Sequence, residues 1–172
     1  MRWERLFGEL EGHAEHALLE ERDALVAELR DGEWATRSWL DGLQDASEVE
    51  LCVHNVGVVS GRIHLATEHV IHLESASADH LVAPAAVLWV RGATRSPGLA
   101  PGSVTTRLGW GHVLREVQAD ADIARFVLAG GNVIEGRIAA VGRDFVRVVP
   151  SAGERRDIPF GSLALATLRH HV

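Results

Sequence analysis

The chain has 172 residues, of which 24 are acidic and 17 are lysine or arginine, giving a net charge of −7. Its hydrophobic content of 47% is typical of a globular protein, so we expect a packed core rather than a disordered chain. The acidic excess argues against a large non-specific nucleic-acid surface, because neutralising phosphates requires clustered cations.

The first 32 residues are expected to form a long amphipathic helix that ends at Asp31 and Gly32. The stretch has no uninterrupted apolar run, so we expect neither a signal peptide nor a membrane span, and a cytoplasmic location follows. The single cysteine, Cys52, fits a reducing compartment. The apolar residues of this helix and the tryptophan after it are the candidate interface: Trp3, Phe7, Leu10, Leu18, Leu25, Leu29 and Trp34.

Two further helices are expected at 36–46 and 104–119, each just ahead of a strand-rich region. Trp39 lies in the first of them and Trp110 in the second. Their comparable positions predict that each helix packs an indole into the core of the strands that follow.

An internal repeat is predicted from the two strand-rich regions, whose apolar positions and turns follow the same order. The aligned segments are 51–63 with 126–138, 70–73 with 145–148, and, after one inserted residue, 81–87 with 157–163. The first pair matches without a gap and ends in a shared Gly-Arg-Ile. Each copy therefore predicts a strand, a tight turn and a second strand, within about five short strands in all.

Glycines mark the turns and bends of both copies. Residues 55–57 and 130–132 have the composition of hairpin turns that need positive φ. Gly61 and Gly136 lie inside the following strands, where glycine permits a sharp bend. We expect a mainly β protein with helices (α+β), organised as an N-terminal helix at 1–32, a first five-stranded barrel with its leading helix at 33–92, a linker at 93–103 and a second such barrel at 104–172.

This arrangement resembles the Sm-like superfamily, which includes Lsm proteins and bacterial Hfq. The resemblance rests on the leading helix, the five short strands, the turn glycine and the bend glycine, and segment 126–138 is the closer copy. Other SH3-like barrels and PRC-type barrels share these features and are the alternative. The resemblance implies two small open barrels whose fourth and fifth strands are exposed edges, which tend to pair with another chain.

Family members that bind RNA carry Asp, Asn and an aromatic residue in the loop after the second strand, and Arg-Gly or Lys-His near the last strands. Here the loops at 66–69 and 141–144 read Ala-Thr-Glu-His and Val-Gly-Arg-Asp. The late positions, 84–85 and 160–161, read Pro-Ala and Phe-Gly. The family's RNA-binding residues are therefore absent, and RNA or DNA binding remains the alternative function through a local arginine patch of Arg62, Arg91, Arg95, Arg107 and Arg137.

No motif indicates an enzyme. The sequence has no nucleophile elbow, P-loop, dinucleotide fingerprint or His-Glu-x-x-His, and its ten histidines are not spaced as zinc ligands. We therefore expect no catalytic residue, metal, cofactor or small-molecule substrate. The sequence favours a non-enzymatic binding or assembly module that contacts a protein partner, or another copy of itself, through edge strands and the N-terminal helix.

Overall fold

The computed structural model describes residues 38–93, except Asp45, together with 108–118 and 123–169. It also describes a few residues nearer the N-terminus, all helical and exposed: Arg22, Asp23, Leu25, Val26, Gly32 and Ala35. The rest of the predicted N-terminal helix lies outside the described residues. The chain divides into two units, Met1–Ser38 and Trp39–Val172, and every described strand belongs to the second.

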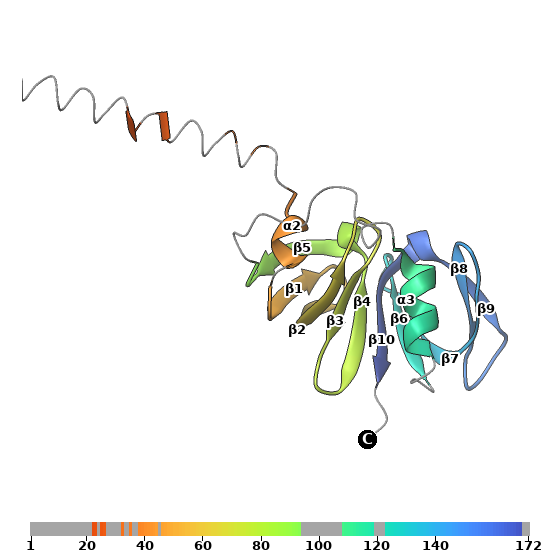
Figure 1. Cartoon of the computed structure of the whole chain (residues 1–172). Helices are drawn as coiled ribbons and strands as arrows, with labels where there is room; N and C mark the ends of the chain where they lie inside the picture. Colours follow the sequence, from red (N-terminus) through yellow and green to blue (C-terminus); the bar gives the residue numbers. More distant parts are fainter. Residues whose placement is uncertain are drawn as a thin grey trace, which may run out of the picture. The chain divides into compact units, whose positions relative to one another are not determined.

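Ten strands form one continuous antiparallel sheet (Figure 1). The first five are β1 (Val49–Val53), β2 (Gly57–Ala66), β3 (Ile71–Glu74), β4 (Ala78–Val82) and β5 (Val87–Arg91). The second five are β6 (Ala124–Leu128), β7 (Val133–Val141), β8 (Phe145–Val149), β9 (Arg156–Pro159) and β10 (Leu163–Arg169). Their order across the sheet is β5-β1-β2-β3-β4-β10-β6-β7-β8-β9.

The expected pair of five-stranded barrels is wrong. The two groups of strands are joined by β4 and β10, which pair from Leu165 opposite Val82 to Arg169 opposite Ala78. Unpaired N–H and C=O groups make a strand edge a template for another strand. The fourth-strand edge, expected to be exposed, is therefore covered within the chain, and the described strands form one open sheet with its edges at β5 and β9.

The helices are shorter than expected. Among the described residues of 36–46, the helix is the single turn α2 (Asp41–Gln44), and Trp39 precedes it with 44% of its surface exposed. Trp39 therefore does not fill a core. Helix α3 (Trp110–Val117) begins after Gly109, whose extended backbone does not continue the helix toward Leu108. Trp110 is only 5% exposed and does pack into the core.

Two apolar clusters form the core, and β10 contributes to both. Leu165 packs with the cluster built mainly from β1 to β4, which includes Leu51 and Leu73. Ala166 and Leu168 of the same strand pack with the cluster around Phe126, α3 and β8. Alternate residues of a strand point to opposite faces of the sheet. Strand β10 therefore ties the two halves together through its side chains as well as its backbone.

Both strand-turn-strand predictions are confirmed at the residues where they were made. Strand β1 pairs with β2, and β6 with β7. The pairing of β2 with β3 shifts register between Ile63 and Leu65, and that of β7 with β8 shifts between Ile138 and Ala140. These β-bulges follow Gly61 and Gly136 by a few residues, and a β-bulge bends the strand that carries it.

Candidate functional site

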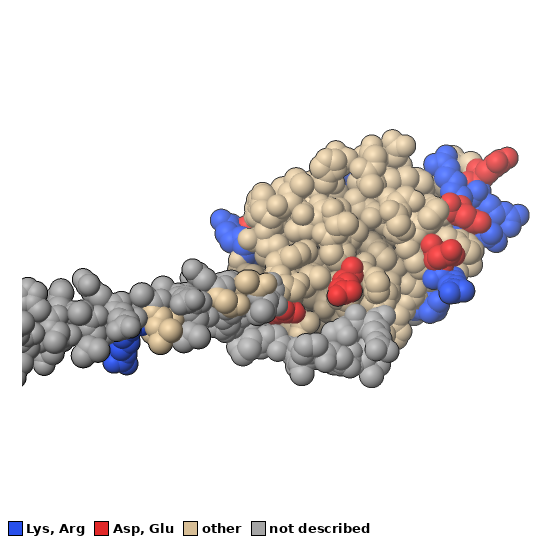
Figure 2. All heavy atoms as spheres, turned by 90° about the horizontal axis from the view of Figure 1, so that it is seen from above, with Lys and Arg blue, Asp and Glu red and all other residues tan. Residues whose placement is uncertain are grey.

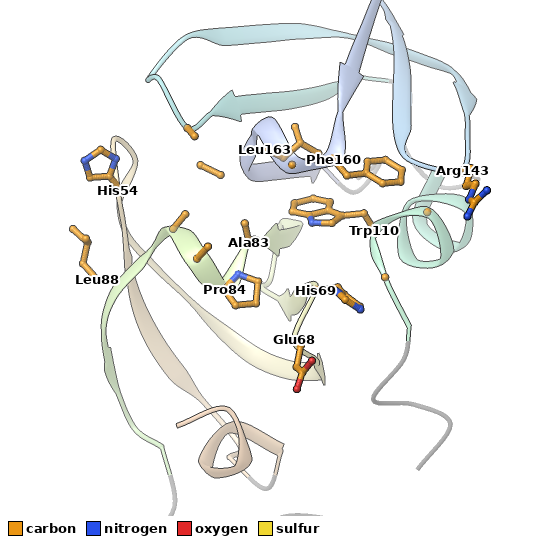
Figure 3. A pocket seen from close by; sticks show the side chains of 17 residues that line it. His54, Glu68, His69, Ala83, Pro84, Leu88, Trp110, Arg143, Phe160 and Leu163 are labelled. Carbon is orange, nitrogen blue, oxygen red and sulfur yellow. The ribbon is translucent and has the colours of Figure 1, made fainter. Parts of the chain in front are cut away.

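A pocket of about 610 Å³ opens where the ends of the two halves meet (Figure 3). Small residues leave this space unfilled, because their side chains cannot reach across it. They come from the turn after β4, from the start of α3, from the turn after β6, from the connection between β9 and β10, and from β10 itself: Ala83, Pro84, Ala85, Ala86, Gly109, Gly111, Ala129, Gly161 and Ala164.

Two aromatic rings form one wall of the pocket. Trp110 is the first residue of α3, and Phe160 is the first residue of the 3-10 helix η4 (Phe160–Ser162). The ring centroids are 6.4 Å apart and the ring planes are 22° from parallel. The backbone N–H of Phe160 donates a 2.8 Å hydrogen bond to the carbonyl oxygen of Asp144, which fixes η4 against the turn between β7 and β8.

The polar side chains in the pocket wall are His54, Glu68, His69 and Arg143, all exposed. Within the described parts of the chain, none of these side chains makes a hydrogen bond or ion pair. In Figure 3, Arg143 lies toward the end that holds the Trp110 and Phe160 rings, and His54 lies at the opposite end. The pocket therefore combines an apolar, aromatic wall with polar side chains that have no partner among the described residues.

Thr67 holds the Glu68 and His69 loop in place. Its Oγ1 accepts hydrogen bonds from the backbone N–H groups of His69 (3.1 Å) and Val70 (3.0 Å), and lies 3.0 Å from the carbonyl oxygen of Leu108. The residue is only 3% exposed. The loop after β2 is therefore joined to the segment that enters α3, although 41 positions separate Thr67 and Leu108.

The pocket was not predicted from the sequence. The loops at 66–69 and 141–144 and the residues at 160–161 were compared only with the RNA-binding residues of the Sm-like superfamily, which they lack. The structure brings all three segments to one pocket. A run of small residues near an aromatic residue, as at 83–86 and 160–164, was the only local signal.

The two free edges of the sheet are the second candidate site. Edge strand β5 exposes Leu88 by 61% and Trp89 by 46%. Edge strand β9 is exposed except at Ile158. Arg147 of β8 braces β9, because its Nε and Nη2 each donate a 2.7 Å hydrogen bond to the Asp157 carboxylate. One edge is therefore apolar and aromatic, and the other is charged.

The predicted arginine patch is only partly described, and its described members are not together. Arg62 lies on β2 and Arg137 on β7, with four strands between them. Arg91, at the end of β5, forms a 2.5 Å ion pair with Glu50, whose hydrogen bond raises the pKa of the guanidinium. Arg95 and Arg107 lie outside the described residues. On the face seen in Figure 2, cations gather at the margins, where they alternate with acidic residues.

Of the predicted interface, only Leu25 is described; it is helical and 56% exposed. The other members lie outside the described residues: Trp3, Phe7, Leu10, Leu18, Leu29 and Trp34. Within the part of the chain that the structure describes, no helix has the length and apolar character needed to cross a membrane.

Histidines and carboxylates meet on strands β2 to β4. His64 Nε2 lies 2.6 Å from Glu74 Oε2, and His72 Nε2 lies 2.8 Å from Asp79 Oδ1. The two imidazole rings stack with centroids 5.2 Å apart. Across the described ranges, no group of three or more histidine, cysteine, aspartate or glutamate residues is arranged to hold a metal ion. These side chains therefore pair with one another along the sheet.

Comparisons with protein-family models, with curated proteins and with solved structures find no match to this chain. A proposal for the function therefore rests on the pocket and on the edge strands β5 and β9.

Proposed function

We propose that this protein is a non-enzymatic assembly module in which β5 of one copy pairs with β9 of the next. The observation that carries the proposal is the joint inside the chain. There the fourth strand of the first half, β4, pairs with the last strand of the second half, β10. The fourth strand of the second half is β9 and the last strand of the first half is β5. Among the described strands, these two are the edges of the sheet.

The internal joint specifies a register for the pairing between copies. Leu165 lies opposite Val82 in the joint. Trp89 pairs with Cys52 of β1, and Leu165 pairs with Val127 of β6. Cys52 and Val127 are aligned in the repeat, so Trp89 corresponds to Leu165. In the same way, Val82 pairs with Ile71 of β3 and Ile158 pairs with Val146 of β8, so Ile158 corresponds to Val82. The register therefore places Trp89 opposite Ile158, so that the exposed indole would be covered on association.

Two residues further along, the same register places Arg91 opposite Arg156. Like charges directly across a strand pair oppose pairing, although Glu50 already neutralises part of the charge of Arg91. Pro159 at the end of β9 has no N–H, whereas the corresponding Ala83 donates one across the internal joint. Both differences make the pairing between copies weaker than the joint within the chain.

Pairing of β5 with β9 is heterologous, because it joins different surfaces of the two copies. Such contacts produce closed rings where the rotation between copies closes and open filaments where it does not. We expect association to increase with protein concentration rather than to stop at a dimer.

Light scattering of the full chain at several concentrations tests the proposal. Arg156→Glu places a carboxylate opposite Arg91 and should increase the mass at a given concentration. Arg155→Glu makes the same change of charge one residue before β9 and is the matched control. A strict monomer at every concentration, in the wild type and in Arg156→Glu, would overturn the proposal.

Nucleic-acid binding is the second candidate function, and the net charge of −7 and the separation of Arg62 from Arg137 give it less support. It requires affinity for labelled single-stranded RNA that falls steeply with salt. Absence of binding at low salt would remove it. Membership of the Sm-like superfamily also remains a proposal, supported by the Gly-Gly-Asn turn and bend glycine of segment 126–138.

A further inference from the structure

The pocket beside Trp110 is large enough for an organic ligand, and edge strand β5 contributes one residue, Leu88, to its lining. Its volume of about 610 Å³ far exceeds the roughly 30 Å³ that one water occupies, and it lies in the range of about 300–1,000 Å³ typical of small-molecule sites. An apolar wall with a few unpaired polar groups is also typical of such sites.

The aromatic wall selects for a flat ring. Trp110 is buried against the core and the Phe160 ring stacks against it, so both rings are already in place before a ligand binds. Offset stacking on fixed aromatic rings contributes affinity beyond the burial of area. Small residues, such as Ala83 and Gly161, leave the space in front of these rings open.

The charge of the wall selects for an anion at the aromatic end. Arg143 has a permanent positive charge and no ion-pair partner among the described residues. It follows Gly142 directly, and a Cβ on Gly111 would contact both the Gly142 carbonyl oxygen and the Phe160 ring at 3.5 Å. The turn that carries Arg143 therefore adjoins the aromatic wall. Among the described residues that line the pocket, Glu68 is the one acidic side chain, and it adjoins His69.

We propose that this pocket binds a small, flat aromatic molecule that carries one anionic group, with the ring against Phe160 and the small exposed part of Trp110 and the anion at Arg143. The site joins elements of both halves, since the loop after β2 lines it together with α3 and η4. Binding of such a ligand would therefore stabilise the two halves together.

The test compares three probes that share a ring and differ in charge: 1-naphthoate, 1-naphthalenemethanol and 1-naphthylmethylamine. The Trp110 indole N–H is followed by NMR during each titration of the full chain, so affinity and location come from one signal. We expect 1-naphthoate to bind about three- to tenfold more tightly than the neutral alcohol, the scale of an exposed charge-assisted hydrogen bond. The amine should bind most weakly. Equal affinities, or tightest binding of the amine, would overturn the proposal.

Two variants separate the ring contact from the charge contact. Arg143→Gln should remove the preference for 1-naphthoate and leave the alcohol unchanged, whereas Arg137→Gln, on an exposed part of β7 outside the pocket, should change neither. Gly161→Phe should block all three probes, because a Cβ there meets no atom within 4 Å and its ring would occupy the pocket. Unchanged binding of 1-naphthoate to both pocket variants would contradict the assignment. Displacement of bound 1-naphthoate only by RNA, and by no free aromatic acid, would assign the site to a macromolecule instead.

Discussion

A Cβ atom on Gly61 would lie 2.5 Å from the carbonyl oxygen of Glu74, so β2 passes β3 at a point where only glycine fits. Gly136 has the same relationship with Val149 at 2.5 Å in the second half. A backbone carbonyl cannot swing away as a flexible side chain can. The two glycines therefore set how closely the long strands approach their neighbours.

Replacing either glycine with alanine should destabilise the protein. We expect Gly61→Ala and Gly136→Ala each to lower the free energy of unfolding by about 1–3 kcal/mol, the usual cost of overpacking. Gly130→Ala is the control, because a Cβ there meets nothing within 4 Å. Urea unfolding followed by circular dichroism measures the change. Equal stabilities of Gly61→Ala and Gly130→Ala would show that the close approach does not constrain the strand.

The continuous sheet predicts that the two halves unfold together. Leu165 is 1% exposed and belongs to a strand of the second half, yet it packs in the cluster of the first. Leu165→Ala should cost about 2–5 kcal/mol, as deletion of buried methyl groups does, in a single cooperative transition. Hydrogen exchange measures the protection of backbone amides in each half separately. Loss of protection in β6 to β9 alone would show that they are separate folding units.

The ion pair of Arg147 and Asp157 makes the stability of edge strand β9 depend on pH in the acid range. The hydrogen bonds from Arg147 lower the pKa of Asp157 below its ordinary value of 3.8. A carboxylate with a lowered pKa stabilises the folded state above its unfolded pKa, and that contribution disappears as the pH falls through the folded pKa. Arg147→Gln should raise the pKa of Asp157 toward 3.8 in an NMR titration. Arg125→Gln, which changes another exposed strand arginine, should leave the pKa of Asp157 unchanged.

Local features of the fold were predictable, and its long-range connections were not. The Gly-Gly-Asn turn at 130–132 and the bend glycines follow from backbone sterics, which act within a few residues. The pairing of β4 with β10 depends on backbone N–H and C=O groups that every strand carries, so no residue type in the sequence indicates it. The helix at 36–46 was overestimated because its apolar spacing fits a helix, but a short helix is stable only where packing supports it.

The pocket could not be predicted for a related reason. Its walls come from segments as far apart as His54 and Phe160, and its volume results from alanines and glycines, which have no chemistry of their own. The described arginines of the predicted patch, Arg62, Arg91 and Arg137, lie on separate strands, whereas Arg143, in a turn, adjoins the aromatic wall. Exposed strand arginines are placed by the alternation of the strand, and loop residues are placed by tertiary contacts.

An engineered disulfide between copies tests the assembly proposal most directly. The predicted register puts Arg91 opposite Arg156, and residues opposite each other in an antiparallel pair have Cα atoms about 4.5–5.5 Å apart, which a disulfide can span. Both side chains are exposed, so cysteines there leave the core intact. Cys52→Ser removes the only native thiol.

Arg91→Cys and Arg156→Cys chains are mixed in the Cys52→Ser background, oxidised with glutathione disulfide and separated under denaturing, non-reducing conditions. Pairing of β5 with β9 predicts a cross-linked product that contains one chain of each kind and is more abundant than the homodimers of either. Arg155→Cys mixed with Arg91→Cys should give much less. Equal cross-linking with both partners, or none with Arg156→Cys at concentrations where light scattering detects association, would contradict pairing of β5 with β9.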